Sequence, residues 1–315
     1  MKKATVVIPN YNGKEYLHKC LKALEGQKDA DFDVIIVDNG SEDGSHKVKG
    51  KYKLKLEVVR FEENRGFSAA VNEGIKRAET PFVILLNNDA YATPNFVKNL
   101  VERMDWDEGL FSAQGLMLQQ NRKDLVDSAG DLFCGFGWAF SRGKDKSLAP
   151  YVVPRDVFSA CAGAAIYRKS VFDEIGLFDE TFFAYLEDVD IGYRARLMGY
   201  RNAVVPESMV FHVGSGSSGN RHNSFKVTLA ARNTFLMMYK NFSVWQWILN
   251  GPAIGFGMLV KLIYFSRKKL GKEYREGISQ YRKMKKNVQK FNKGTAANRW
   301  KIQWELFLNC FKRLL

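Results

Sequence analysis

The chain has 315 residues, of which 46% are hydrophobic and 26% charged, and its mean hydropathy is −0.28. This composition excludes collagen, coiled coil and wholesale disorder. The formal charge of +14 is uneven, because residues 1–242 carry 32 basic and 31 acidic groups whereas residues 243–315 carry 16 and 3. We therefore predict two domains, 1–242 and 243–315, the second of which meets an anionic surface. No nucleic-acid-reading motif occurs, so we expect no nucleic-acid partner.

Strands alternate with helices along the first hundred residues. Apolar runs predict strands at 5–8, 34–37, 54–61 and 82–86, and apolar residues at helical spacing predict helices around 16–24 and 67–78. This alternation predicts an α/β fold with a mostly parallel sheet covered by helices. The alternation weakens between 105 and 155, where 142–146 reads as an exposed loop. Beyond it we expect a strand at 158–167, a helix at 185–198, and short strands at 204–205 and 210–213.

The cysteines and the N-terminus indicate the compartment. The four cysteines include no C-x-x-C pair and no close histidine, which disfavours a zinc site or a disulfide framework: Cys20, Cys134, Cys161 and Cys310. Only Ala4 to Ile8 forms an apolar run before Pro9, too short for a secretory signal. We expect a cytoplasmic protein with free thiols.

Polar clusters follow three of the predicted strands. They are Pro9-Asn10-Tyr11-Asn12-Gly13, Asp38-Asn39-Gly40-Ser41 and Asn87-Asn88-Asp89. Ligands of open α/β sheets bind beyond the carboxyl ends of the strands, so three such clusters at one edge predict a nucleotide site. The alternative is that Asn, Asp and Gly only form turns there.

Three acidic residues begin the helix predicted at 185–198. Glu187, Asp188 and Asp190 lie in its first turn, where the helix dipole favours negative charge, so capping explains one or two of them. The preceding Phe182-Phe183-Ala184-Tyr185 would partly desolvate a carboxylate and raise its pKa toward that of a working base. The pattern favours a general base at this helix start.

Two residues at strand ends are candidate metal ligands. Asp89, beside two carboxamides, is a hard oxygen ligand suited to Mg²⁺ or Mn²⁺ holding a diphosphate. His212 also ends a strand and would favour Mn²⁺, although a single histidine is more often structural.

The segment Gly214-Ser-Gly216-Ser-Ser-Gly219 matches G-x-G-x-x-G. A dinucleotide fingerprint needs an acid about 20 residues further on, but none occurs between Glu207 and Glu273. A loop that gives backbone N–H groups to phosphates, with Arg221 and Arg232 nearby, fits better. A solvated loop without a ligand is the alternative.

Six motifs in order resemble the family 2 glycosyltransferases, which share the GT-A fold, and especially their bacterial rhamnosyltransferase-like branch. The match covers residues 3–242 and comprises Val7-Ile-Pro-Asn-Tyr-Asn-Gly13, Val37-Asp-Asn-Gly-Ser41, Asn64-Arg-Gly-Phe67 with Asn72, Leu86-Asn-Asn-Asp-Ala90, Gly176-Leu-Phe-Asp-Glu180 and Phe183-Ala-Tyr-Leu-Glu-Asp-Val-Asp190. The resemblance implies a Rossmann-like mixed sheet flanked by helices and an inverting transfer of a sugar from a nucleotide donor.

The resemblance also implies roles for individual residues. Nucleotide-sugar binding is expected of Pro9, Asn10, Tyr11, Glu15, Asp38, Asn39, Asn64, Arg65, Asn72, Asn88 and Gly163. Asp188 would be the base, with Glu187 beside it, and Asp89 and His212 would hold Mn²⁺ or Mg²⁺. The family's D-x-D motif reads Asn87-Asn88-Asp89, which should weaken metal affinity. The Q-x-x-R-W motif of processive synthases is absent, which favours addition of a single sugar.

The branch that the chain resembles implies L-rhamnose transfer from dTDP-rhamnose to a lipid-linked glycan in cell-surface polysaccharide assembly. A UDP-sugar donor is the alternative within the same chemistry. The alternative from another class is a non-catalytic, membrane-bound nucleotide-binding scaffold.

The basic tail contains an apolar segment and two amphipathic ones. Val244 to Phe265 is long enough to span a membrane, but Gly251-Pro252, Gly255 and Gly257 favour a broken or interfacial segment, and spanning would place a net charge of +12 on the far side. Apolar residues at helical spacing recur among lysines at 270–291 and 300–314. We expect peripheral association with the inner face of the cell membrane. The alternatives are packing on the catalytic domain and an oligomer interface.

Overall fold

The computed structural model of the protein describes residues 2–48, 50–214 and 223–314. Its strands are β1 (Ala4–Asn10), β2 (Phe32–Asp38), β3 (Leu56–Arg60), β4 (Phe82–Leu86), β5 (Ala90–Ala92), β6 (Leu110–Gln119), β7 (Val126–Ser128), β8 (Asp131–Cys134), β9 (Trp138–Ser141), β10 (Arg155–Val157), β11 (Ala164–Arg168) and β12 (Arg201–His212). Its α-helices are α1 (Lys14–Glu25), α2 (Gly66–Arg77), α3 (Phe96–Trp106), α4 (Val171–Ile175), α5 (Glu187–Leu197), α6 (Ser224–Asn241), α7 (Val244–Arg267), α8 (Gly271–Met284) and α9 (Ala296–Leu314).

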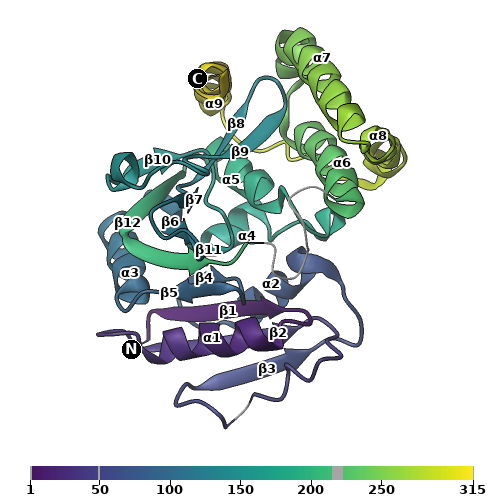
Figure 1. Ribbon diagram of the computed structural model, residues 1–315. Helices are drawn as coiled ribbons and strands as arrows, with labels where there is room; N and C mark the ends of the chain where they lie inside the picture. The colour runs from purple at the N-terminus through teal and green to yellow at the C-terminus, as the bar shows by residue number, and fades with distance from the viewer. Residues whose placement is uncertain (1, 49, 215–222, 315) are drawn as a thin grey trace.

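A mixed sheet forms the centre of the molecule (Figure 1). Its main path is β10-β12-β6-β11-β4-β1-β2-β3, with β5 paired to β12 and β7 to β6. The strands β4, β1, β2 and β3 are parallel, as the β-α alternation predicts. The strand β11 runs antiparallel between β4 and β6, so the sheet is more mixed than the first hundred residues alone indicate.

Helices cover both faces of the sheet and make two hydrophobic cores. Alternate residues of β1 show the division, because Val6 and Ile8 belong to the core that α1 and α3 cover, whereas Val7 belongs to the core under α2, α4 and α5. This alternation is the two-residue period of a strand buried on both faces. The α/β prediction is therefore confirmed, and the carboxyl ends of β1, β2 and β4 lie at one edge.

Several element boundaries differ from the sequence-based predictions. Only the second part of the strand expected at 158–167 is a strand, β11. Residues 158–163 connect β10 to β11 instead, and 161–163 line a cavity. The two short strands expected at 204–205 and 210–213 are one strand, β12, with a bulge between Val205 and Met209. The weakly alternating region contains the long strand β6, whose period-2 signal is lost because nine of its ten residues are buried.

The basic tail forms helices α7, α8 and α9, which lie at the opposite end of the molecule from β3 (Figure 1). They share a hydrophobic cluster with the rest of the chain, in which Val288, Ile302 and Leu306 pack with Phe133 and Tyr193. The helix α8 lies against α6, and α9 lies against β8 and α5. A cut at residue 242 would expose this cluster, so the division into two domains at 242/243 stays a prediction.

The helix α7 is continuous over Val244–Arg267, although its glycines and Pro252 predict a helix break there. Among the described residues it is the one helix long and apolar enough to cross a bilayer, judged by length and composition alone. The predicted helix at 270–291 ends at Met284, and Val288 and Phe291 follow outside it. The helix at 300–314 is confirmed as part of α9.

Candidate functional site

A cavity of about 870 Å³ opens at the carboxyl ends of the strands. It runs between two groups of residues: those that follow β1, β2 and β4, and those of the β8–β9 hairpin and the segment 183–189. Eleven of the predicted site residues line it: Pro9, Asn10, Tyr11, Asn39, Asn64, Asn88, Asp89, Gly163, Glu187, Asp188 and His212. Residues from four strand ends and one helix start therefore meet in one cavity.

Buried side-chain amides join the strand ends at the first side of the cavity. Asn10 donates from Nδ2 to Asp38 Oδ1 at 3.0 Å and accepts on Oδ1 from Asn88 Nδ2 at 2.8 Å. Asn39 donates to Asn64 Oδ1 at 3.0 Å and accepts from the backbone N–H of Arg65 at 2.8 Å. Because the polar groups bond to one another across the strand ends, they form a fixed wall rather than independent turns.

Four predicted binding residues lie outside the cavity lining. Glu15 is exposed in the first turn of α1, and Arg65 is exposed with an ion pair to Glu180. Asp38 is fully buried behind Asn10. Asn72 exchanges hydrogen bonds with the backbone of Phe178, donating at 2.8 Å and accepting at 3.0 Å. The structure thus places Asp38 and Asn72 as supports behind the cavity wall.

The two predicted metal ligands face each other. His212 Nε2 lies 3.2 Å from Asp89 Oδ1, and both side chains are largely buried. On its other side, His212 Nδ1 lies 2.8 Å from Asp127 Oδ2, the carboxylate–histidine arrangement that orients metal-binding imidazoles. Burial lowers the pKa of His212, but the hydrogen bonds that its ring nitrogens donate to the Asp127 and Asp89 carboxylates outweigh this effect and raise the pKa to about 9. Asp89 and His212 offer an oxygen and a nitrogen ligand, and a divalent cation would replace the Nε2 proton of the imidazole, because a metal-bound histidine is neutral.

The candidate base lies at the start of α5. Asp188 Oδ1 accepts from the backbone N–H of Val189 at 2.8 Å, and burial raises the pKa of Asp188 against the effect of such hydrogen bonds. Burial and the neighbouring Asp188 raise the pKa of Glu187 well above its usual range. The third acid, Asp190, faces away and forms a buried ion pair with Arg194 Nη2 at 2.9 Å. Buried ion pairs with Arg194 and Lys240 therefore explain Asp190, whereas Glu187 and Asp188 line the cavity.

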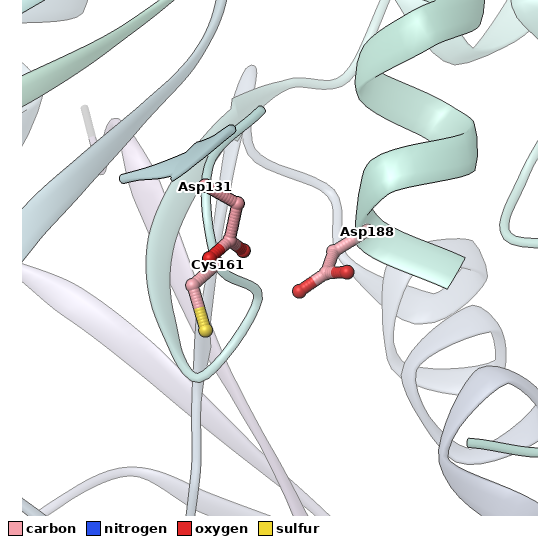
Figure 2. Close-up of side chains that lie close together, drawn as sticks. All are labelled: Asp131, Cys161 and Asp188. Atoms are coloured by element: carbon pink, nitrogen blue, oxygen red, sulfur yellow. The ribbon is translucent and has the colours of Figure 1, made fainter. Parts of the chain in front are cut away.

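A third carboxylate faces the base. Figure 2 shows Asp188 projecting from the start of α5 toward Asp131 and Cys161. Ligating atoms of the three lie within 4.8 Å of one another, a spacing that a metal ion could occupy. Ser141 Oγ donates to Asp131 Oδ1 at 2.9 Å. Burial and the charge of Asp188 raise the pKa of Asp131 to about 8, and burial raises the pKa of the Cys161 thiol. The candidate base therefore lies in a desolvated acidic pocket.

Sequence reasoning missed Asp127, Asp131 and Lys144, which also line the cavity. Asp127 lies in the middle of β7 and Asp131 begins β8, both in the weakly alternating region. Their spacing in Val126-Asp-Ser-Ala-Gly-Asp131 is their only signal. Lys144 belongs to the segment predicted to be an exposed loop, but it forms an ion pair with Asp127. The loop prediction is confirmed, but Lys144 is only partly exposed, because it also lines the cavity.

The predicted phosphate loop is only partly visible. Residues 215–219 and Arg221 lie outside the described residues, whereas Gly214 lines the cavity. Arg232, predicted to lie near this loop, is not among the residues that line the cavity. Its Nη2 donates to the backbone carbonyls of Thr181 at 3.2 Å and Phe182 at 2.8 Å.

Two bacterial relatives match much of the chain. A glycosyltransferase of Bacillus subtilis, YfnE, is 29% identical over 241 residues, which are 62% of this chain and 61% of that protein. The N-acetylglucosaminyl-diphospho-decaprenol L-rhamnosyltransferase of Mycobacterium tuberculosis is 24% identical over 277 residues, 78% of this chain and 89% of that protein. The chain thus spans less than two thirds of the first relative and most of the second.

Solved glycosyltransferase structures share the fold. GalNAc-T7 with UDP, GalNAc and Mn²⁺ has a TM-score of 0.63 at 15% identity, covering 92% of this chain and 55% of that one. The mannosyltransferase PcManGT of Pyrobaculum calidifontis, in complex with GDP-Man and Mn²⁺, has a TM-score of 0.55 at 13% identity, covering 100% and 81%. The fold is therefore GT-A, as the motifs imply.

The family model for glycosyl transferase family 2 matches residues 5–176. This range is more than half of the chain and includes the strand ends that carry Asn10, Asn39 and Asp89. The chain belongs to glycosyl transferase family 2.

Proposed function

We propose that the protein is a metal-dependent, inverting glycosyltransferase that adds one sugar to an acceptor hydroxyl. The observation that carries this proposal is that a desolvated carboxylate, Asp188, and the facing pair Asp89 and His212 line one cavity with the amide wall at the strand ends. Group transfer needs a base for the acceptor and charge stabilisation for the departing diphosphate. In this proposal, Asp188 supplies the base, and a cation held by Asp89 and His212 would supply the charge stabilisation.

In the proposed reaction, Asp188 removes the proton from the acceptor hydroxyl as its oxygen bonds to the anomeric carbon of the donor. The bond from that carbon to the donor phosphate breaks, and its electron pair leaves with the nucleoside diphosphate, so the configuration inverts. A divalent cation held by Asp89 and His212 would stabilise the negative charge of the diphosphate. Asp127 would keep the imidazole of His212 oriented through Nδ1.

We propose dTDP-L-rhamnose as the donor and a lipid-linked glycan as the acceptor. The mycobacterial relative is named an N-acetylglucosaminyl-diphospho-decaprenol L-rhamnosyltransferase, which supports L-rhamnose as the sugar and a lipid-linked acceptor. The choice of dTDP as the nucleotide rests on the branch that the motifs resemble. A UDP-sugar remains the second candidate, because the related solved structures include complexes with UDP and UDP-GlcNAc.

A donor screen tests this function. With Mn²⁺ or Mg²⁺ present, we expect slow donor hydrolysis for one nucleotide sugar and calorimetric binding of its nucleoside diphosphate, dTDP before UDP. Removal of the metal with a chelator should abolish the hydrolysis. If no donor is hydrolysed with any divalent metal while a nucleotide still binds, the protein is the non-catalytic scaffold instead.

We further propose that α7 and α9 lie on the anionic inner face of the cell membrane. Large apolar side chains on these helices remain exposed; the most exposed are Val244, Ile248, Trp300 and Trp304, at 60–74%. Trp245 stacks on Trp300 with ring centroids 4.5 Å apart, which joins the two helices into one surface. By contrast, the predicted apolar stripe of α8 packs on α6 through Tyr274. An exposed apolar surface next to the basic residues 267–269 is typical of interfacial helices.

The double variant Ile248→Glu/Trp304→Glu should weaken binding of the full chain to anionic vesicles by about tenfold or more, because it places two charges against the acyl chains. Wild-type binding should also weaken with added salt. Trp106→Glu is the matched control, since Trp106 is 80% exposed on the distant helix α3. If the double variant binds vesicles like wild type but sediments as a smaller particle than wild type, α7 and α9 form an oligomer interface instead.

A further inference from the structure

The segment that leads into the base has a rare backbone conformation. The backbone φ angles of Phe183, Tyr185 and Leu186 are 62°, 70° and 70°, which residues other than glycine seldom adopt. Leu186 immediately precedes the first turn of α5, which carries Glu187 and Asp188. Strained conformations of this kind persist only where the surrounding structure fixes them. Whatever holds this segment therefore determines where the Asp188 carboxylate lies.

One buried side chain on α6 contacts three carbonyls of the segment. Asn233 Nδ2 lies 3.0 Å from the carbonyl oxygen of Phe182 and 2.8 Å from those of Ala184 and Tyr185. The side chain is fully buried, and its Oδ1 accepts from Arg232 Nε at 2.9 Å, which fixes the orientation of the amide. Only a carboxamide or a cation offers several N–H donors at one such point.

The opposite side of the segment is held by α2. The carbonyl of Phe183 accepts from the backbone N–H of Phe67 at 2.6 Å and of Ser68 at 3.4 Å. A Cβ on Gly66 would lie 2.6 Å from that carbonyl oxygen, so glycine is needed for this close approach. The helix α2 thus supplies N–H groups to one carbonyl, and Asn233 supplies them to the carbonyls on both sides of it.

We propose that Asn233 is a positioning residue for catalysis, which holds residues 182–186 in the strained conformation that presents Asp188 to the cavity. The inference rests on the proposed role of Asp188 as the base. Without the carboxamide, the carbonyls of Ala184 and Tyr185 lose their donor, and the left-handed residues relax toward ordinary backbone angles. The Asp188 carboxylate then shifts, whereas the amide wall and the Asp89–His212 pair, which belong to other elements, stay in place.

The test compares Asn233→Ala with Asn309→Ala. Asn309 is also fully buried, and it donates to the carbonyl of Phe133 at 3.0 Å, away from the segment. We expect Asn233→Ala to lower kcat by about 10²-fold, since a displacement of about 1 Å is enough for that. The affinity for the nucleoside diphosphate with Mn²⁺, measured by calorimetry, should not change. Asn309→Ala should lower thermal stability without this kcat loss.

Hydrogen exchange gives a readout that does not depend on activity. The amides of residues 183–186 should exchange faster in Asn233→Ala and at the wild-type rate in Asn309→Ala. If Asn233→Ala does not fold, Arg232→Met removes the bonds to Thr181 and Phe182 and should give a smaller effect of the same kind. Unchanged exchange of these amides, or equal losses of kcat and donor affinity, would overturn the proposal. Faster exchange in a protein whose Asp188→Asn variant is fully active would instead overturn the role of Asp188 alone.

Discussion

Asp188→Asn is expected to lower kcat by roughly 10²–10⁴, because the carboxamide cannot accept the proton of the acceptor hydroxyl. Donor affinity should stay almost unchanged, since the interaction that is lost belongs to the transition state. The wild-type rate should fall as the pH drops through the pKa of Asp188. Because burial raises that pKa, the fall should occur at a higher pH than for an ordinary aspartate. Initial rates of sugar transfer against pH, with calorimetric donor binding, provide the measurement.

The control for this substitution is Asp173→Asn, which changes an exposed aspartate in the first turn of α4. It should leave kcat near the wild-type value. Near-normal turnover in Asp188→Asn would remove Asp188 from the role of base and direct attention to Glu187 or Asp131, which line the same cavity.

Asp89→Ala is expected to remove the stimulation by Mn²⁺ and to lower kcat/KM by about 10³-fold, because a bound cation contributes several kcal/mol of charge stabilisation to the departing diphosphate. The substitution leaves His212 as the remaining side-chain ligand of the facing pair. Rates measured across a Mn²⁺ titration, with and without chelator, give the result.

A substitution next to the proposed ligands tests the metal site further. Asp127→Asn keeps both proposed ligands but weakens the hydrogen bond that orients His212, so it should lower metal affinity by about 10–100-fold at a kcat that high Mn²⁺ restores. Asp124→Asn, at an exposed position nearby, should have no effect. Equal metal stimulation in wild type and Asp89→Ala would show that the cation binds elsewhere, for instance at Asp131, Cys161 and Asp188.

Part of the site could be predicted because its residues follow strands. Asn10, Asn39 and Asp89 each come after an apolar run that can only be a buried strand, and parallel strands bring their carboxyl ends to one edge. Asp127 and Asp131 follow no such run. They reach the cavity through the short strands β7 and β8, whose few residues carry almost no periodic signal. Asn233 lies within a helix, where nothing in the local pattern marks it.

The tail illustrates the same limit. Its charge and its helical apolar stripes could be read from the sequence, but a stripe has the same spacing whether it faces protein, lipid or a second copy. The structure separates the stripe that packs on the protein from the one that does not, because Tyr274 of α8 is buried against α6 whereas Trp300 and Trp304 of α9 are exposed. The opposite side of α9, with Ile302 and Leu306, packs in the shared core.

The sequence by itself determined the α/β architecture and the family, and it supplied the residues proposed as base and metal ligand, because strand patterns and motifs are local in the chain. Only the tertiary structure decided which side chains meet. Asp131 faces Asp188 across 57 positions, and Asn233 bonds to Ala184 across 49. Such contacts depend on how helices and strands pack, and a buried carboxylate or carboxamide takes its role from the partners that this packing supplies.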